Sequence, residues 1–119
     1  MGGGNADVTI QHGTCHCGAV NLALDSSPIE AAECNCSLCR RVAALWHYCP
    51  PPQLRVTGEL AGYVQGDRTL TTWRCANCGN VTHWTAIDPD YPRVGVNLRL
   101  FDPALWQDLP RKLIDGASY

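Results

Sequence analysis

The placement of cysteine constrains this chain more than any other feature of its sequence. Eight cysteines occur in 119 residues, and seven of them fall in three short clusters. The clustered residues are Cys15 and Cys17, then Cys34, Cys36 and Cys39, then Cys75 and Cys78. The first residues contain neither a basic start nor an apolar stretch of signal-peptide length, so we expect a cytoplasmic protein with reduced thiols. Clustered thiols in that setting predict metal ligands rather than disulfides.

Length and composition predict one small globular domain. The chain is long enough for a single core, and 45% hydrophobic against 17% charged residues excludes a disordered chain. We expect residues 1–9 to form a flexible tail and residues 10–119 to form one zinc-binding domain. No apolar run reaches the roughly 18 residues that a membrane-spanning helix needs. A net charge of -2 provides no basic field, so neither nucleic acid nor a membrane surface is an expected partner.

Apolar and polar residues alternate along several short segments, which predicts a mainly β, antiparallel fold with few short helices. The alternation is plainest in residues 19–25 and 93–100. Weaker strand patterns cover residues 8–12, 29–34, 54–57, 61–64, 70–74 and 81–86. Two short helical segments are expected. One follows Asp102 and has Pro103 at its first position, and the other is capped by Ser37 and ends at Val42.

Two of the cysteine clusters have the spacing of a closed structural metal site. Cys15 and Cys17 are two residues apart, so their thiols project to the same side of an extended segment. Cys75 and Cys78 are three apart and precede Gly79, which can adopt a positive φ and let backbone amides approach the sulfurs. These four thiolates match the number that closes a tetrahedral zinc site.

The middle cluster provides three thiols within six residues, which leaves one position of a tetrahedral metal open. Three protein ligands and one open position are typical of catalytic zinc. Because three thiolates donate much negative charge, we expect such a zinc to suit an incoming thiol better than a water. The spacing also allows an alternative, in which Cys36 and Cys39 join Cys75 and Cys78 in one closed four-cysteine site.

Three ordered motifs carry a resemblance to a known family. Residues 13–20 read Gly-Thr-Cys-His-Cys-Gly-Ala-Val, residues 34–41 read Cys-Asn-Cys-Ser-Leu-Cys-Arg-Arg, and residues 73–79 read Trp-Arg-Cys-Ala-Asn-Cys-Gly. Together they resemble the glutathione-dependent formaldehyde-activating enzymes, which share a domain with centromere protein V. Asn35 stands where that pattern often carries histidine.

The resemblance implies a β-tent zinc-binding domain with two zinc ions per chain. The implied ligands are Cys15, Cys17, Cys75 and Cys78 for a structural zinc, and Cys34, Cys36 and Cys39 for a catalytic zinc. The implied reaction joins glutathione to formaldehyde to give S-hydroxymethylglutathione, which is carbon–sulfur lyase chemistry in the synthetic direction. The partners expected from it are a small thiol and a small aldehyde. The alternative function is a non-catalytic, zinc-stabilised protein-binding module.

Other polar residues and the eighth cysteine carry weaker predictions. Arg40 and Arg41 directly follow the open cluster, where guanidinium groups can bind the carboxylates of an acidic thiol. Solvated surface side chains are the alternative for both arginines. We expect His47 and His83 to make structural hydrogen bonds. Cys49 lies outside any ligand spacing and is expected to be a small buried residue.

Overall fold

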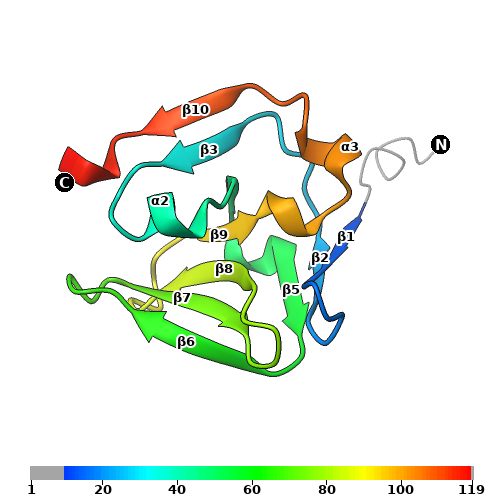
Figure 1. Ribbon diagram of the computed structural model, residues 1–119, viewed down its shortest axis with the longest axis horizontal. Helices are drawn as coiled ribbons and strands as arrows, with labels where there is room; N and C mark the ends of the chain where they lie inside the picture. Colours follow the sequence, from blue (N-terminus) through cyan, green and yellow to red (C-terminus); the bar gives the residue numbers. More distant parts are fainter. Residues whose placement is uncertain (1–9, 119) are drawn as a thin grey trace.

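Ten short strands and a few helical turns build the fold, which a computed structural model describes for residues 10–118 (Figure 1). The strands are β1 (Gln11–Thr14), β2 (Asn21–Leu24), β3 (Ala31–Cys34), β4 (Trp46–Cys49), β5 (Leu54–Thr57), β6 (Leu60–Val64), β7 (Leu70–Cys75), β8 (Val81–Ala86), β9 (Val94–Asn97) and β10 (Arg111–Ile114). The helices are α2 (Cys39–Val42) and α3 (Pro103–Trp106), and 3₁₀ turns cover Pro51–Gln53, Leu98–Leu100 and Gly116–Ser118. The mainly β prediction is confirmed. The expected tail, residues 1–9, lies outside the described residues.

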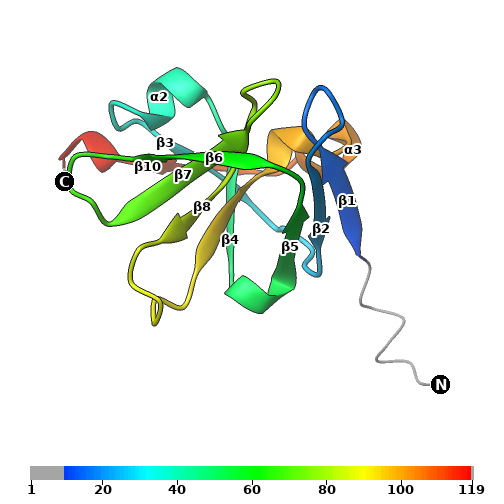
Figure 2. The same cartoon turned by 90° about the horizontal axis from the view of Figure 1, so that it is seen from below.

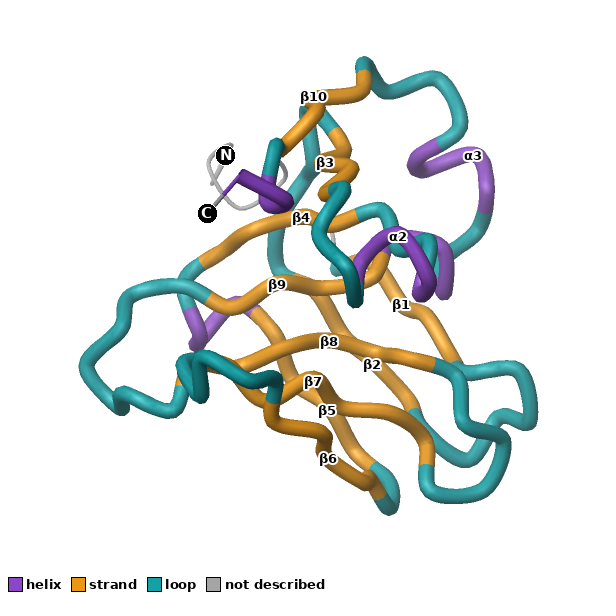
Figure 3. Tube along the Cα trace, turned by 60° about the vertical axis from the view of Figure 1, so that its left-hand side comes forward, coloured by secondary structure: helices purple, strands orange, loops and turns teal. Residues whose placement is uncertain are grey.

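The strands form two sheets. A three-stranded sheet has the order β1-β2-β5 and lies to one side of the molecule (Figure 2). A seven-stranded sheet has the order β10-β3-β4-β9-β8-β7-β6 (Figure 3). All pairings are antiparallel except that of β10 with β3, where Arg111 lies opposite Ala31. The mainly antiparallel prediction is confirmed, and this pair is the parallel exception among the described strands.

The predicted strands agree with the observed ones in place, and differ at some ends. Residues 54–57 and 81–86 match β5 and β8 over their whole lengths. The predicted segment 93–100 is wrong beyond Asn97, because the Asn97 side chain accepts a hydrogen bond from the Arg99 backbone N–H and turns the chain into a 3₁₀ turn. Strands β4 and β10 were not predicted. Three of the four residues of β10 are exposed, so it lacks the apolar alternation that marks a half-buried strand.

The two predicted helical segments exist, but only one begins as expected. Asp102 accepts a hydrogen bond from the Ala104 backbone N–H at 2.9 Å and caps α3, which confirms that prediction. The predicted cap at Ser37 is wrong, because α2 is preceded by Leu38 and has no side-chain cap. No helix in residues 10–118 is long and apolar enough to cross a membrane.

Two apolar clusters cover opposite faces of the larger sheet. The main core joins β2 of the smaller sheet, through Leu22 and Leu24, to Val94 and Val96 of β9. The second cluster is centred on Ala32, Ala44 and Trp46, and Cys34, Cys39, Tyr48, Val81, Trp84 and Ile114 are among the side chains that pack against it. Because alternate residues of a strand point to opposite faces, Trp46 and Tyr48 lie on one face of β4 and Cys49 on the other. The second cluster positions the middle cysteine motif.

Candidate metal centres

The first and third cysteine motifs meet in a four-cysteine cluster, although 58 residues separate Cys17 from Cys75. The sulfurs of Cys15, Cys17, Cys75 and Cys78 lie within 4.8 Å of one another. The Sγ atoms of Cys15 and Cys17 are 3.6 Å apart, and those of Cys17 and Cys75 are 3.7 Å apart. A tetrahedral zinc with Zn–S bonds of about 2.3 Å has sulfur–sulfur edges of about 3.8 Å. The four sulfurs are therefore placed to bind one metal ion.

Backbone amides surround the sulfur of Cys75. The chain turns sharply after β7, so the N–H groups of Asn77 and Cys78 point at the Cys75 Sγ, at 3.3 and 3.4 Å. Gly79 has a φ of 79°, which confirms the positive φ expected for it, and its N–H donates to the Cys75 carbonyl at 3.0 Å. Such N–H groups stabilise a thiolate over a thiol, because they interact with its negative charge. The Cys78 N–H has the largest effect on the pKa of the Cys75 thiol and lowers it, but burial and hydrogen bonds with Cys15 and Cys17 leave the pKa raised overall. The turn therefore supplies N–H partners for a Cys75 thiolate.

Cys15 and Cys17 lie in a turn, so the predicted extended segment is wrong here: the Gly18 N–H donates to the Cys15 carbonyl at 3.1 Å. This turn also brings N–H groups to the sulfurs. The Val20 N–H donates to the Cys15 Sγ at 3.2 Å, and Gly18 has a φ of 84°. Hydrogen bonds from the Asn77 side chain and then the Ala19 backbone lower the pKa of the Cys17 thiol to about 6. These contacts favour the ionised thiols that bind metal.

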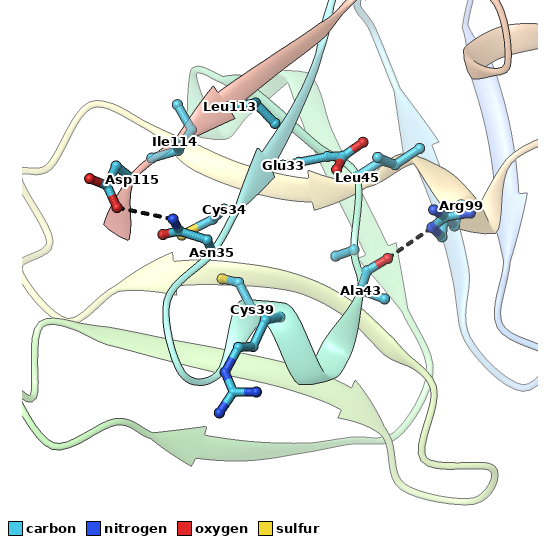
Figure 4. A pocket seen from close by; sticks show the side chains of 12 residues that line it. Glu33, Cys34, Asn35, Cys39, Ala43, Leu45, Arg99, Leu113, Ile114 and Asp115 are labelled. Carbon is cyan, nitrogen blue, oxygen red and sulfur yellow. Dashed lines mark hydrogen bonds between the residues drawn. The ribbon is translucent and has the colours of Figure 1, made fainter. Parts of the chain in front are cut away.

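The middle motif forms a separate three-cysteine cluster, of which Figure 4 shows Cys34 and Cys39. Cys34 ends β3, Cys36 lies in the following loop, and Cys39 begins α2; their three sulfurs lie within 4.8 Å of one another. Burial raises the pKa of the Cys39 thiol. Burial also opposes ionisation of Cys36, but hydrogen bonds led by the Cys39 backbone N–H, 3.2 Å from its sulfur, lower its pKa. Because Cys36 and Cys39 lie with Cys34, and Cys75 and Cys78 lie with Cys15 and Cys17, the alternative four-cysteine site is not the one found.

An unpartnered donor faces the three-cysteine cluster. In residues 10–118, the indole Nε1 of Trp46 is the buried side-chain nitrogen or oxygen that lacks a hydrogen-bond partner. Trp46 is 3% exposed, and its N–H faces the Cys39 thiol, whose pKa it lowers against the larger effect of burial. A thiolate accepts an N–H far better than a thiol does. The Trp46 N–H therefore gains its best acceptor when Cys39 is ionised. Because metal binding requires an ionised thiol, these residues fit a bound metal.

A hollow of about 490 Å³, which we call the metal-side pocket, adjoins the three-cysteine cluster. Cys34 and Cys39 form part of its wall (Figure 4). Two guanidinium groups, of Arg40 and Arg99, and two carboxylates, of Glu33 and Asp115, also line it. Arg99 Nε donates to the Ala43 carbonyl at 2.8 Å and stays beside the pocket. The pocket thus offers paired positive and negative groups next to the sulfurs.

Comparison with known proteins identifies the family. Residues 10–112 match the family model described as glutathione-dependent formaldehyde-activating enzyme. The chain belongs to this family. It is also similar to a Rhodobacter sphaeroides protein solved in a structural genomics programme, with 33% sequence identity and a TM-score of 0.69. That similarity covers 85% of this chain and 99% of the Rhodobacter chain. No curated protein matches the chain.

In this formaldehyde-activating enzyme family member, the C-terminal turn covers one side of the three-cysteine cluster. Asn35 holds the turn, because its Nδ2 donates to Asp115 Oδ1 at 3.0 Å (Figure 4) and its Oδ1 accepts the Ala117 N–H at 2.9 Å. A Cβ placed on Gly116 would lie 2.6 Å from the Cys34 Sγ. Sequence reasoning missed these residues, since their proximity to the cysteines depends on β10 pairing with β3. The sequence signal that could have indicated this contact was Asn35, which stands where the family pattern often carries histidine.

The two predicted arginines differ in position. Arg40 lines the metal-side pocket, whereas Arg41 Nη1 donates to the Ser37 carbonyl at 2.6 Å and does not line it. Arg99 takes the place beside the pocket that the sequence suggested for Arg41. Nothing in the spacing of Arg99, 60 residues after Cys39, indicated this role.

The histidines and Cys49 lie outside both clusters. His47 Nε2 is 2.9 Å from Ser26 Oγ, and His83 Nδ1 is 2.7 Å from Thr82 Oγ1, so each histidine has the hydrogen bond predicted for it. Burial lowers the pKa of His83 to about 4, which keeps this ring neutral near pH 7. Cys49 is buried in the main core, as predicted, and burial raises its pKa to about 11.

Proposed function

We propose that this chain is a zinc-dependent carbon–sulfur lyase-type enzyme that, in the synthetic direction, condenses glutathione with formaldehyde to S-hydroxymethylglutathione. In this proposal Cys15, Cys17, Cys75 and Cys78 hold a structural zinc, and Cys34, Cys36 and Cys39 hold a catalytic zinc. The contrast between the clusters carries the proposal. Four sulfurs fill all four coordination positions of a tetrahedral metal ion. Three sulfurs beside a pocket leave one coordination position for a substrate.

The charges of the metal-side pocket match those of glutathione. Glutathione carries two carboxylates and one ammonium group at neutral pH. Arg40 and Arg99 supply two guanidinium groups for the carboxylates. Glu33, which is also 3.4 Å from Arg111 Nε, and Asp115, which also accepts hydrogen bonds from Asn35 and Ser118, supply negative charge for the ammonium. Binding of the peptide ends by these side chains would direct its central thiol toward Cys34 and Cys39. A zinc bound there supplies a site for that thiol and lowers its pKa.

The reaction itself is an addition to a carbonyl group. The ionised sulfur of glutathione forms a bond to the formaldehyde carbon, and the electrons of the carbon–oxygen π bond move to the oxygen. The proton that the thiol lost ends on that oxygen, so atoms and charge balance without an oxidant or reductant. The chain contributes by holding both reactants together, which removes much of the entropic cost of their encounter.

Exchange spectroscopy tests this function directly. The zinc-loaded chain is mixed with glutathione and ¹³C-formaldehyde, and the rate of interconversion with S-hydroxymethylglutathione is measured by NMR against the same mixture without protein. We expect a faster interconversion with the wild-type chain. Cys36→Ser is expected to lower this acceleration by about 100-fold, because it removes a ligand of the open site.

A matched measurement separates the enzyme from the protein-binding module. In the cobalt-substituted chain, glutathione is expected to change the visible spectrum, since its sulfur would enter the open position. Circular dichroism of Cys36→Ser tests whether the variant is folded, as we expect. No acceleration above the background, together with no spectral change on adding glutathione, would overturn the proposal and favour the module.

A further inference from the structure

A second hollow opens near the three-cysteine cluster, on the face of the larger sheet that carries Trp46. Its volume is about 830 Å³, which suits a small-molecule ligand. Tyr48, Trp84, Tyr91, Arg93 and Ile114 are among its lining residues, and we call it the aromatic groove. Tyr91 and the neighbouring Ile87 are 40% and 48% exposed. The groove therefore presents apolar surface that no described part of the chain covers.

Three adjacent strands build the floor of the aromatic groove. Tyr48 of β4 lies opposite Gly95 of β9, and Gly95 lies opposite Trp84 of β8. A Cβ on Gly95 would collide with the Trp84 Nε1, so the missing side chain lets the indole lie across the sheet. The ring centroids of Tyr48 and Trp84 are 5.9 Å apart, and those of Trp84 and Tyr91 are 6.4 Å apart. The floor is thus an aromatic platform formed before any ligand binds.

The polar groups of the aromatic groove favour an anion beside that platform. The Arg93 guanidinium lies 5.9 Å from the centroid of the Tyr48 ring, and it makes no ion pair with any carboxylate in residues 10–118. The carboxylates of Asp67 and Asp88 accept backbone N–H groups of their own loops, from Thr69 and Asp90. Arg68 also lines the aromatic groove and makes no ion pair in residues 10–118, but Arg93 is the guanidinium at the Tyr48 ring. Arg93 is therefore the cation placed to bind the carboxylate of a ligand on the platform.

The aromatic groove adjoins the three-cysteine cluster. Tyr48 and Trp84 pack against the same apolar cluster as Cys34 and Cys39. Ile114 lines both the aromatic groove and the metal-side pocket. Formaldehyde has a single carbon and cannot use an aromatic platform. The groove is therefore much larger than the proposed reaction with formaldehyde requires.

We propose that the aromatic groove binds the body of a larger aldehyde substrate, an aromatic aldehyde that carries a carboxylate. Its ring lies on Tyr48 and Trp84, and its carboxylate binds Arg93. The inference rests on the proposed function, because the aldehyde carbon is the atom that the thiol attacks. The balance is the same as with formaldehyde: a sulfur–carbon bond forms, the carbonyl π bond opens, and the thiol proton ends on the oxygen.

Binding is measured first with 4-methylbenzoate, which has the ring and the carboxylate but no reactive aldehyde. Titration into the zinc-loaded chain is followed by amide chemical shifts of β4, β8 and β9. Arg93→Gln is expected to weaken binding about tenfold, because it removes the charged partner of the carboxylate. Tyr63→Ala is the matched control, since Tyr63 is an exposed aromatic residue on β6 outside the groove, and it should leave binding unchanged.

Catalysis is then compared for 4-formylbenzoate and formaldehyde, each with glutathione. We expect Arg93→Gln to lower kcat/KM for 4-formylbenzoate about tenfold and to leave the rate with formaldehyde within about twofold. If formaldehyde reacts faster with the chain but 4-methylbenzoate does not bind, or binds equally well to Arg93→Gln, the groove assignment is overturned and the proposed function stands. If 4-methylbenzoate binds through Arg93 but neither aldehyde reacts faster than the background, the proposed function is overturned, and the substrate role of the groove with it.

Discussion

The four-cysteine and three-cysteine clusters use the same ligand atom in different surroundings. In the four-cysteine cluster, backbone N–H groups contact the sulfurs of Cys15 and Cys75, which are both buried. In the three-cysteine cluster, the unpartnered indole N–H of Trp46 faces Cys39, the C-terminal turn lies against Cys34, and a pocket adjoins two of the sulfurs. The number of sulfur ligands and the access of small molecules to them therefore separate a closed metal site from an open one.

The largest expected effect tests whether only the four-cysteine cluster maintains the fold. Cys75→Ser removes a buried sulfur that accepts two backbone N–H groups, and we expect it to cost more than about 3 kcal/mol and abolish cooperative thermal unfolding. Cys36→Ser is expected to remain folded. Native mass spectrometry and circular dichroism measure zinc per chain and unfolding. Equal loss of structure in both variants would break the division between the clusters.

The next prediction concerns the donor that distinguishes the three-cysteine cluster. Trp46→Phe removes the indole N–H that faces Cys39, so we expect metal affinity at this cluster to fall about tenfold while the four-cysteine cluster is unaffected. A chelator titration followed by the sulfur-to-cobalt absorption measures both sites. Trp106→Phe is the control, because its N–H donates to the Phe101 carbonyl. Equal affinities in the two variants would remove Trp46 from the metal site.

A smaller effect is expected at the metal-side pocket, which adjoins the three-cysteine cluster. Arg40→Gln and Arg99→Gln each remove a guanidinium from the metal-side pocket, so each should raise KM for glutathione about tenfold with little change in kcat. Arg41→Gln serves as the control and should have an effect within about twofold, since Arg41 does not line the pocket. Steady-state kinetics measure the split. An Arg41 effect as large as the others would place the substrate elsewhere.

The smallest expected effect concerns the C-terminal turn beside the three-cysteine cluster. Gly116→Ala adds a methyl group 2.6 Å from the Cys34 Sγ, so the turn must shift, at a cost of about 1 kcal/mol in the free energy of unfolding. Gly66→Ala is the matched change, because a Cβ there meets nothing within 4 Å. Urea unfolding measures the difference. A loss no larger than that of Gly66→Ala would show that the turn does not press on the cluster.

Much of the fold was predictable because short-range patterns encode it. The alternation in residues 54–57 and 81–86 matches β5 and β8, and Asp102 caps α3 as expected. The exposed strand β10 was not predictable, because it pairs with β3 through backbone hydrogen bonds and carries no apolar pattern. Asn97 ended a predicted strand early through a side-chain hydrogen bond that hydrophobic periodicity does not represent.

The candidate site was predictable in its ligands and less so in its surroundings. The spacing of the cysteines allowed two groupings, and the family resemblance implied groups of four and three thiols, which are the groups that the structure has. Arg99 and Asp115 reach the pocket of the three-cysteine cluster from distant parts of the chain, whereas Trp46 follows Cys39 closely in the sequence and faces it from β4. Their positions at the site depend on which strands become neighbours, so no local sequence pattern predicted them.

The sequence by itself determined the turn at Cys75 and Cys78, because a three-residue spacing and a following glycine act through local backbone geometry. Tertiary structure alone decided that the motif at Cys15 meets the motif at Cys75 and that Tyr48, Gly95 and Trp84 form one platform. The physical reason is range. Local turns need only neighbouring residues, whereas a closed metal site and an aromatic groove need strand register across the whole sheet.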